Sequence, residues 1–175
     1  MIVRYVFSFV FLFMFCMLSF SAFASNNETL KCAVDEERYN AYMDNASEWF
    51  DSARDILERQ NLSPLWLYLM LTESGGNAFA VSKKGAVGPW QLTPLIAKKF
   101  GCTDRRNVEQ STFAAAMYIK KLMKDFNGNV EKVIQAYNMG GSNLRKLGKP
   151  TREAKHLSWV VVCLFQNDPL GLSEK

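Results

Sequence analysis

Apolar side chains recur at three- and four-residue steps through much of the chain, and this spacing predicts amphipathic helices. The first strong pattern spans Asp35 to Gln60, where one face would carry Tyr39, Tyr42, Trp49, Phe50, Ala53, Ile56 and Leu57. The segment Asn61-Leu62-Ser63-Pro64 interrupts that pattern. We therefore expect one long helix that ends at the start of this segment.

A second helix is expected from Leu65 to about Glu73. Ser63 is a suitable N-cap, and Pro64 suits the first helical position. Residues 65–71 are all apolar or aromatic, and a helix that is apolar all round is usually buried. The sequence therefore places this helix in the core.

The rest of the chain alternates helical patterns with glycine-containing breaks. Residues 78–88 read as an irregular loop, and Ser111-Thr112 read as the cap of one of the later helices. The expected helices are Pro89–Phe100, Phe113–Phe126, Val130–Asn138 and, after a break at Gly140-Gly141, Arg152–Phe165. No segment favours strands once Val160-Val161-Val162 is read in its helical setting. The fold class expected is all-α, in a single domain.

The first 24 residues have the layout of a secretory signal peptide. Arg4 provides the positive start, an apolar run extends from Tyr5 to Leu18, and Ala22 and Ala24 form a small-x-small end. We expect cleavage after Ala24, which gives a mature domain of residues 25–175 in the periplasm or outside the cell. The alternative is a membrane anchor, but the run is short for a span of about 20 residues.

The charge balance is mildly basic. The chain has a net charge of +4, to which the leader contributes only Arg4. Such a balance suits a polyanionic wall or a membrane surface without requiring either. No basic cluster with interleaved aromatic residues indicates nucleic-acid binding, so none is expected.

Cysteine usage predicts one disulfide in the exported chain. Cys32, Cys102 and Cys163 remain after the leader is removed, and an oxidising compartment favours one bond and one free thiol. All three pairings remain open. With His156 as the single histidine and no Cys-x-x-Cys spacing, we expect neither a metal site nor a cofactor.

Glu73 is the residue whose chemistry stands out. It would end a buried helix, where apolar surroundings and the negative helix end both raise the pKa of a carboxyl. A carboxyl that stays protonated near neutral pH can serve as a general acid. By itself, however, the pattern is explained as well by a glutamate that reaches solvent at the helix end.

Three motifs decide between these interpretations. They are Glu73-Ser74, the stretch from Ala80 to Pro94 (AVSKKGAVGPWQLTP), and Ala136-Tyr137-Asn138-Met139-Gly140. In this order they resemble the catalytic domain of the soluble lytic transglycosylases, which is related to goose-type lysozyme. The stretch from Asp104 to Ile119 is similar to the membrane-bound D subgroup, and the resemblance covers roughly residues 45 to 165.

The resemblance implies a lysozyme-like helical domain that cleaves the glycan strands of peptidoglycan. Glu73 would protonate the oxygen between N-acetylmuramic acid and N-acetylglucosamine, then act as a base toward the muramyl 6-hydroxyl. The product would be a 1,6-anhydromuramyl end formed without water. This explains why no second carboxylate is evident, although most glycosidases use two.

Further roles carried over from the family concern sugar binding. Ser82 would orient the muramyl acetamide, and Gly88 would let the backbone approach the sugar. Gln91 and Asn138 would supply amide contacts, Tyr137 would place its hydroxyl near Glu73, and Trp90 would form an apolar platform. Structural roles remain open for five of them: Gly88 as a turn glycine, Trp90 as a core residue, Tyr137 as a packing residue, Ser82 as a loop residue and Asn138 as a helix cap. Arg105 and Arg106 read as surface or ion-pairing residues.

One departure from the family lies in the last helix, where Glu153-Ala154-Lys155-His156-Leu157 replaces a segment that usually contains a cleft-facing tyrosine. Two other functions stay open. A hydrolytic muramidase would need a second acid, for which Asp104 and Glu109 are candidates, and a non-catalytic wall-binding protein would not need Glu73. The expected partners are peptidoglycan strands and an envelope-spanning secretion or conjugation apparatus, with the protein acting as a monomer.

Overall fold

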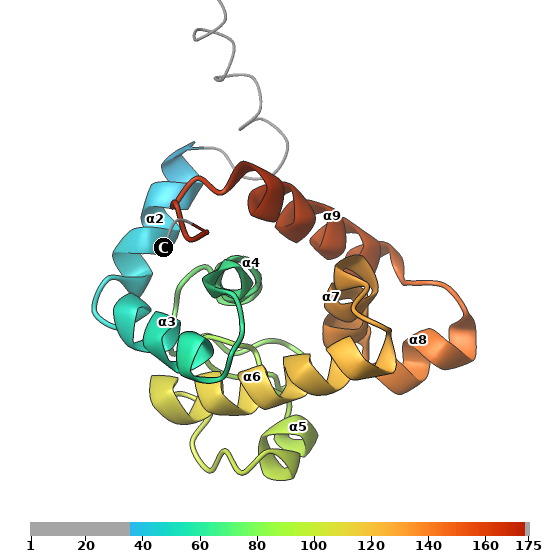
Figure 1. Ribbon diagram of the computed structural model, residues 1–175. Helices are drawn as coiled ribbons and strands as arrows, with labels where there is room; N and C mark the ends of the chain where they lie inside the picture. The colour runs from blue at the N-terminus through green and yellow to red at the C-terminus, as the bar shows by residue number, and fades with distance from the viewer. Residues whose placement is uncertain (1–35, 174–175) are drawn as a thin grey trace, which may run out of the picture. The chain divides into compact units, whose positions relative to one another are not determined.

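The computed structural model describes residues 36–173, and these residues form an all-α arrangement as the sequence predicted. The predicted leader and Cys32 lie outside the described residues. The elements are α2 (Glu36–Ala46), α3 (Phe50–Arg59), the short 3₁₀ helix η3 (Pro64–Trp66), α4 (Leu67–Ser74), α5 (Pro94–Lys99), α6 (Val108–Asp125), α7 (Val130–Met139), α8 (Gly141–Leu147) and α9 (Arg152–Asn167) (Figure 1).

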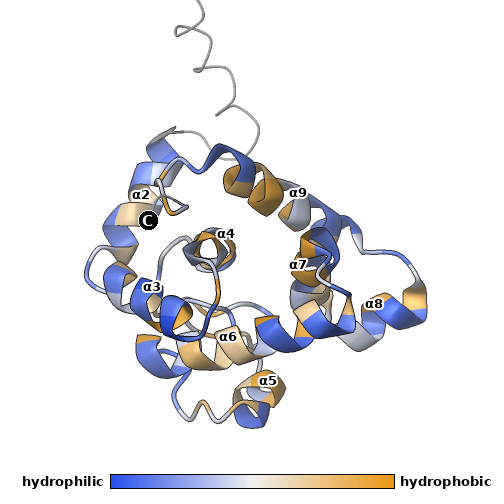
Figure 2. Ribbon diagram, in the orientation of Figure 1, coloured by the Kyte–Doolittle hydropathy of each residue, from blue (hydrophilic) through white to orange (hydrophobic). Residues whose placement is uncertain are grey.

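Helix α4 lies at the centre of this arrangement, as its composition predicted. Residues 67–70 are fully buried and Leu71 is nearly so. Figure 1 shows α4 end-on, with α2, α3, α6, α7 and α9 around it. In Figure 2 the hydrophobic colour is strong on α7 and α9, while α3 is largely hydrophilic on its outer side. The end of α4 is therefore held by the core of the domain.

The single helix predicted for residues 35–60 is wrong, because the chain turns between α2 and α3. The Ser47 hydroxyl donates to the Asp44 carbonyl at 2.9 Å, which competes with the helical backbone. Trp49 has φ −131° and ψ −2°, outside the helical region. The apolar spacing runs through this turn unchanged, so periodicity alone could not reveal it.

Two predicted helix starts are also wrong. Helix α5 begins at Pro94 rather than Pro89, because Thr93 caps it and residues 87–92 form isolated β-bridges instead. Helix α6 begins at Val108, with Asn107 accepting from the Gln110 amide at 2.9 Å. Ser111 and Thr112, predicted as its cap, lie fully buried inside it. Helix α8 was not predicted, whereas α7 and α9 lie close to their predicted bounds.

Asp168 fastens the end of the chain to α4. Its carboxylate accepts from the Tyr68 hydroxyl at 2.7 Å and from the backbone amides of Leu172 and Ser173, each at 2.8 Å. The Leu170 amide donates to the same Tyr68 hydroxyl. These bonds hold the pKa of Asp168 below its ordinary value although burial opposes them. The clasp thus helps to fix the central helix.

Candidate functional site

Glu73 occupies the last turn of α4, where a two-glycine turn ends the helix. Gly75 has φ +62°, and its amide donates to the Leu71 carbonyl at 2.8 Å. A Cβ on Gly76 would lie 2.1 Å from the Tyr42 carbonyl oxygen of α2. Asn45 of α2 also donates to the Gly75 carbonyl. Close packing of α2 therefore explains the two glycines and fixes where the helix ends.

The Glu73 carboxyl has the electrostatics of a general acid. Burial raises its pKa from 4.5 to about 7, and a hydrogen bond from the Asn138 side chain partly opposes this shift. The glutamate is half-buried, so a substrate can reach it. A carboxyl with this pKa is substantially protonated at neutral pH and can give a proton to a leaving oxygen.

Residues 80–92 form a compact loop whose own backbone closes it. The Ser82 amide donates to the Ala86 carbonyl at 2.9 Å, and the Ser82 hydroxyl accepts from the Ala86 amide at 3.0 Å. Val87 makes bridges to both Val81 and Leu92. Ser82 is half-buried, so it both shapes the hairpin and keeps part of its surface open.

Trp90 anchors the loop to α6 and does not form the sugar platform that the sequence suggested. Its side chain is 0% exposed, and its indole nitrogen donates to the Thr112 hydroxyl at 2.8 Å. A fully buried ring offers no face to a ligand. The core alternative holds for Trp90, which ties the loop to α6.

Tyr137 holds the loop from the side of α7. Its buried hydroxyl donates to the Trp90 carbonyl oxygen at 2.9 Å. Burial, followed by the charge of Glu73, raises the pKa of Tyr137 well above its ordinary value. The hydroxyl proton is used in the bond to the Trp90 carbonyl oxygen, so the Tyr137 hydroxyl donates to the loop backbone at Trp90.

Position 88 requires a glycine because the backbone of Arg105 lies against it. Gly88 has φ +86°, and a Cβ there would lie 1.7 Å from the Arg105 carbonyl oxygen. Gly88 is thus approached closely by the backbone of Arg105. This contact explains why a glycine is needed there, and no contact with a sugar has to be invoked. Arg105 itself clamps the loop, since its Nη1 donates to the carbonyls of Gly85 at 2.8 Å and Leu92 at 3.0 Å.

The side-chain amides of Gln91 and Asn138 have different surroundings. Gln91 Nε2 donates to the carbonyls of Gly88 at 2.9 Å and Ala80 at 3.2 Å, and these bonds stabilise the loop. The Gln91 backbone itself has φ +47°. The side-chain amide oxygen of Gln91 has no hydrogen-bond donor among residues 36–173 and is left to accept from a ligand. Asn138 lies exposed in the last turn of α7, and its side chain lowers the pKa of Glu73. Asn138 is not the helix cap, because it lies inside α7 and Gly140 is the C-cap.

Comparison with known families identifies this arrangement. Residues 52–160 match the model described as the transglycosylase SLT domain. The chain belongs to this family. The match contains Glu73, the loop of residues 80–92 and the Tyr137-Asn138 pair, whereas α2, which packs against Gly76, precedes it.

Individual relatives agree with the assignment. The chain is 41% identical over 109 residues to a protein of an Alteromonas strain named for tributyltin chloride resistance, covering 58% of this chain and 52% of that one. It is 32% identical over 111 residues to a transglycosylase of Enterobacteria phage PRD1, covering 63% and 41%. It is 28% identical over 102 residues to membrane-bound lytic murein transglycosylase D of Escherichia coli K12, covering 55% and 23%. The chain thus spans about half or less of these relatives.

A solved structure supports the fold. The lytic transglycosylase Slt of Pseudomonas aeruginosa, determined as an inactive mutant, superposes with a TM-score of 0.52 at 22% identity. The superposition covers 66% of this chain and 24% of that one. The lysozyme-like all-α fold of the SLT domain is therefore confirmed.

Sequence reasoning missed two residues that organise the SLT domain's loop. Arg105 read as a surface cation, and Thr112 read as a helix cap, yet one binds two loop carbonyls and the other accepts from Trp90. The early N-cap signal of Asn107 could have shown that Thr112 lies inside a helix. No local pattern indicates the Arg105 clamp, because its partners are 13 and 20 residues away.

Residues 36–173 contain neither a candidate metal cluster nor a candidate membrane-spanning helix. No cluster of three or more His, Cys, Asp or Glu side chains that could hold a metal occurs within this range. No helix in the same range is long and apolar enough to cross a membrane. Cys102 is buried and is a free thiol.

The bond from Asn138 to Glu73 leads to a pH prediction. Because it lowers the pKa of Glu73, Asn138→Ala should raise that pKa. With Glu73 as the general acid, kcat/KM should fall as pH rises through about 7 in the wild type. In Asn138→Ala this fall should occur at higher pH.

The measurement is kcat/KM against pH on soluble glycan strands. Asn143→Ala is the matched control, since Asn143 is exposed and its side-chain amide donates to the Met139 carbonyl. A loss of activity that is uniform with pH would assign Asn138 to sugar contact alone and contradict its effect on Glu73.

Proposed function

We propose that this protein is a peptidoglycan lytic transglycosylase that cleaves the bond from N-acetylmuramic acid to N-acetylglucosamine and leaves 1,6-anhydromuramyl ends. The observation that carries the proposal is Glu73, a half-buried carboxyl with a pKa of about 7 inside an SLT domain. Its interacting groups are the Asn138 amide and the Tyr137 phenol rather than a second carboxylate.

A single carboxyl suffices for the reaction because it is used twice. Protonated Glu73 gives its proton to the glycosidic oxygen, and the C1–O bond breaks as the developing cation is stabilised by the muramyl acetamide. The resulting carboxylate then takes the proton of the muramyl 6-hydroxyl while that oxygen bonds to C1. Glu73 returns to its protonated state, and water is neither added nor lost. The raised pKa suits both steps because it keeps the acid and base forms close in energy.

Three side chains are proposed to contact the sugar. Ser82 and Asn138 keep exposed surface, and the Gln91 amide oxygen is open to a donor. Trp90, Tyr137 and Gly88 are proposed to act indirectly, by holding the loop in place. The first three residues would therefore contact the sugar directly, and the other three would support the loop.

The geometry gives no support to a hydrolytic muramidase. The Asp104 carboxylate accepts from the Arg106 amide at 2.9 Å. Glu109 lines a separate cavity with Ile56, Arg59, Gln60 and Phe113. Among the described residues, neither Asp104 nor Glu109 is among the groups that shift the pKa of Glu73.

Mass spectrometry of digested peptidoglycan tests the proposal. A transglycosylase gives muropeptides with anhydromuramyl ends, which are one water lighter than the reducing ends that a hydrolase gives. We expect anhydro ends from the purified protein. Reducing ends alone would replace the proposal by the muramidase, and intact strands would favour a wall-binding protein.

Export and a disulfide are part of the proposal. The leader of residues 1–24 would deliver the SLT domain to the periplasm, where its substrate lies. Cys102 is free, while Cys163 is not among the free cysteines of the described residues. We therefore propose the Cys32–Cys163 pair, which non-reducing peptide mapping would detect. Peptidoglycan strands are the proposed substrate, and service to an envelope-spanning apparatus remains a prediction.

A further inference from the structure

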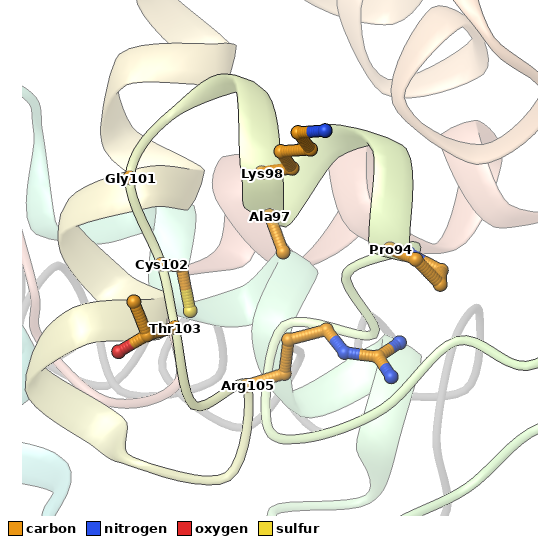
Figure 3. Close-up of a pocket in the computed structure, with 7 residues that line it drawn as sticks. All are labelled: Pro94, Ala97, Lys98, Gly101, Cys102, Thr103 and Arg105. Atoms are coloured by element: carbon orange, nitrogen blue, oxygen red, sulfur yellow. The ribbon is translucent and has the colours of Figure 1, made fainter.

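A pocket of about 350 Å³ lies beside the loop, between α5 and the segment that follows it. It is lined by Pro94, Ala97, Lys98, Gly101, Cys102, Thr103 and Arg105 (Figure 3). In Figure 3 the Arg105 side chain extends from one wall toward Pro94, and Lys98 projects from α5 above it. The two cations therefore border one opening.

Arg105 presents an open hydrogen-bonding edge to this pocket. Its Nη1 is fixed by the carbonyls of Gly85 and Leu92. Its Nε and Nη2 have no hydrogen-bond partner within residues 36–173. These two nitrogens form the fork that binds a carboxylate through two parallel hydrogen bonds. The bonds at Nη1 hold the fork in place before a ligand arrives, which lowers the entropy cost of binding.

The segment that contains the pocket residues is strongly basic. Residues 80–106 contain six basic side chains and one acidic side chain: Lys83, Lys84, Lys98, Lys99, Arg105 and Arg106 against Asp104. The Asp104 carboxylate accepts from a backbone amide two residues on and does not form an ion pair with Arg105. By contrast, residues 36–59 contain seven acidic and three basic side chains. The positive charge is thus a local property of the loop and α5.

We propose that this pocket binds a carboxylate of the acidic stem peptide that peptidoglycan carries on its muramyl groups, with the Arg105 fork and Lys98 as its ligands. The inference rests on the proposed function, because it names which part of that substrate lies beside the loop. The same guanidinium clamps the loop and faces the pocket, so peptide and glycan are recognised on the two sides of one loop. Strands that carry peptides are then preferred over bare glycan.

Binding of the free stem tetrapeptide to the full mature chain tests this without any catalysis. Lys98→Gln should weaken binding about fivefold in calorimetry, the usual scale for one partly exposed charge pair. Lys99→Gln is the matched control, since it removes the same charge from the next residue, which does not line the pocket. A peptide whose carboxylates are amidated should show no measurable binding.

A second arm compares cleavage of peptide-bearing strands with strands stripped of peptides by an amidase. Lys98→Gln should lower kcat/KM about fivefold on the first substrate and leave the second unchanged.

Equal peptide affinity in the wild type and both lysine variants would overturn the assignment. So would inorganic phosphate binding as tightly as the peptide, because the site would then be a general anion site. Absence of strand cleavage with intact peptide binding would instead overturn the proposed function and leave the pocket assignment standing.

Discussion

Glu73→Gln should lower the rate of anhydromuramyl product formation by about 10³-fold or more, because one group acts as both acid and base. Gln has nearly the same shape and can keep the bond to Asn138, but its amide cannot give up a proton to the leaving oxygen. The measurement is product formation followed by mass spectrometry under single-turnover conditions.

Stability provides the internal check on this variant. Burial raises the pKa of Glu73 above its ordinary value, so folding favours the protonated carboxyl. Its contribution to stability is fully present below pH 4.5 and is lost as pH rises through about 7. Gln does not titrate, so at pH 8 Glu73→Gln should be at least as stable as the wild type in thermal unfolding.

Glu109→Gln is the matched control, since Glu109 is exposed and lines a different cavity. It should retain full activity. If Glu73→Gln kept the anhydro product at a wild-type rate, the assignment of the acid would be wrong. If it lost activity together with its thermal transition, the loss would reflect unfolding, and Glu73→Asp would be the second variant to examine.

Gly88→Ala should be the most destabilising of the small substitutions in the loop. Its positive φ costs an alanine about 1–2 kcal/mol, and the clash of its Cβ with the Arg105 carbonyl adds about 1–3 kcal/mol. Because the Arg105 side chain clamps the loop, displacing its backbone should also disturb the loop. We expect a loss of about 3 kcal/mol in the free energy of unfolding and a large loss of activity.

Gly85→Ala separates strain from contact. Gly85 has φ +78°, close to that of Gly88, but its Cβ would have nothing within 4 Å. Its cost should therefore be about 1 kcal/mol, from backbone strain alone. Urea unfolding of both variants measures the difference. Equal destabilisation would show that the approach of Arg105 to Gly88 does not constrain the loop.

Local sequence patterns predicted the elements whose signals are complete within a few residues. Ser63-Pro64 and the all-apolar run after it predicted the start and burial of the central helix. Val130 to Asn138 was predicted because its apolar stripe ends near Gly140, which caps α7. The turn at Ser47 was missed because the stripe on either side of it keeps the same spacing.

The roles of the loop residues could not be predicted in the same way. Trp90 and Tyr137 belong to motifs that suggest ligand contact, but their polar atoms bond to Thr112 and to the loop backbone. Arg105 carried no motif at all. Such roles depend on partners 13 to 47 residues away, and the chemistry of a side chain does not specify which distant atom will satisfy it.

The sequence by itself determined the helical class, the SLT resemblance and the position of Glu73 at the end of a buried helix. Those properties follow from short-range spacing and from motif order, which folding does not alter. Only the tertiary structure decided that α2 closes against Gly76, that burial together with Asn138 sets the pKa of Glu73 to about 7, and that Arg105 joins the loop to a basic pocket. Each of these depends on packing between segments far apart in the chain, where desolvation and hydrogen-bond partners are fixed.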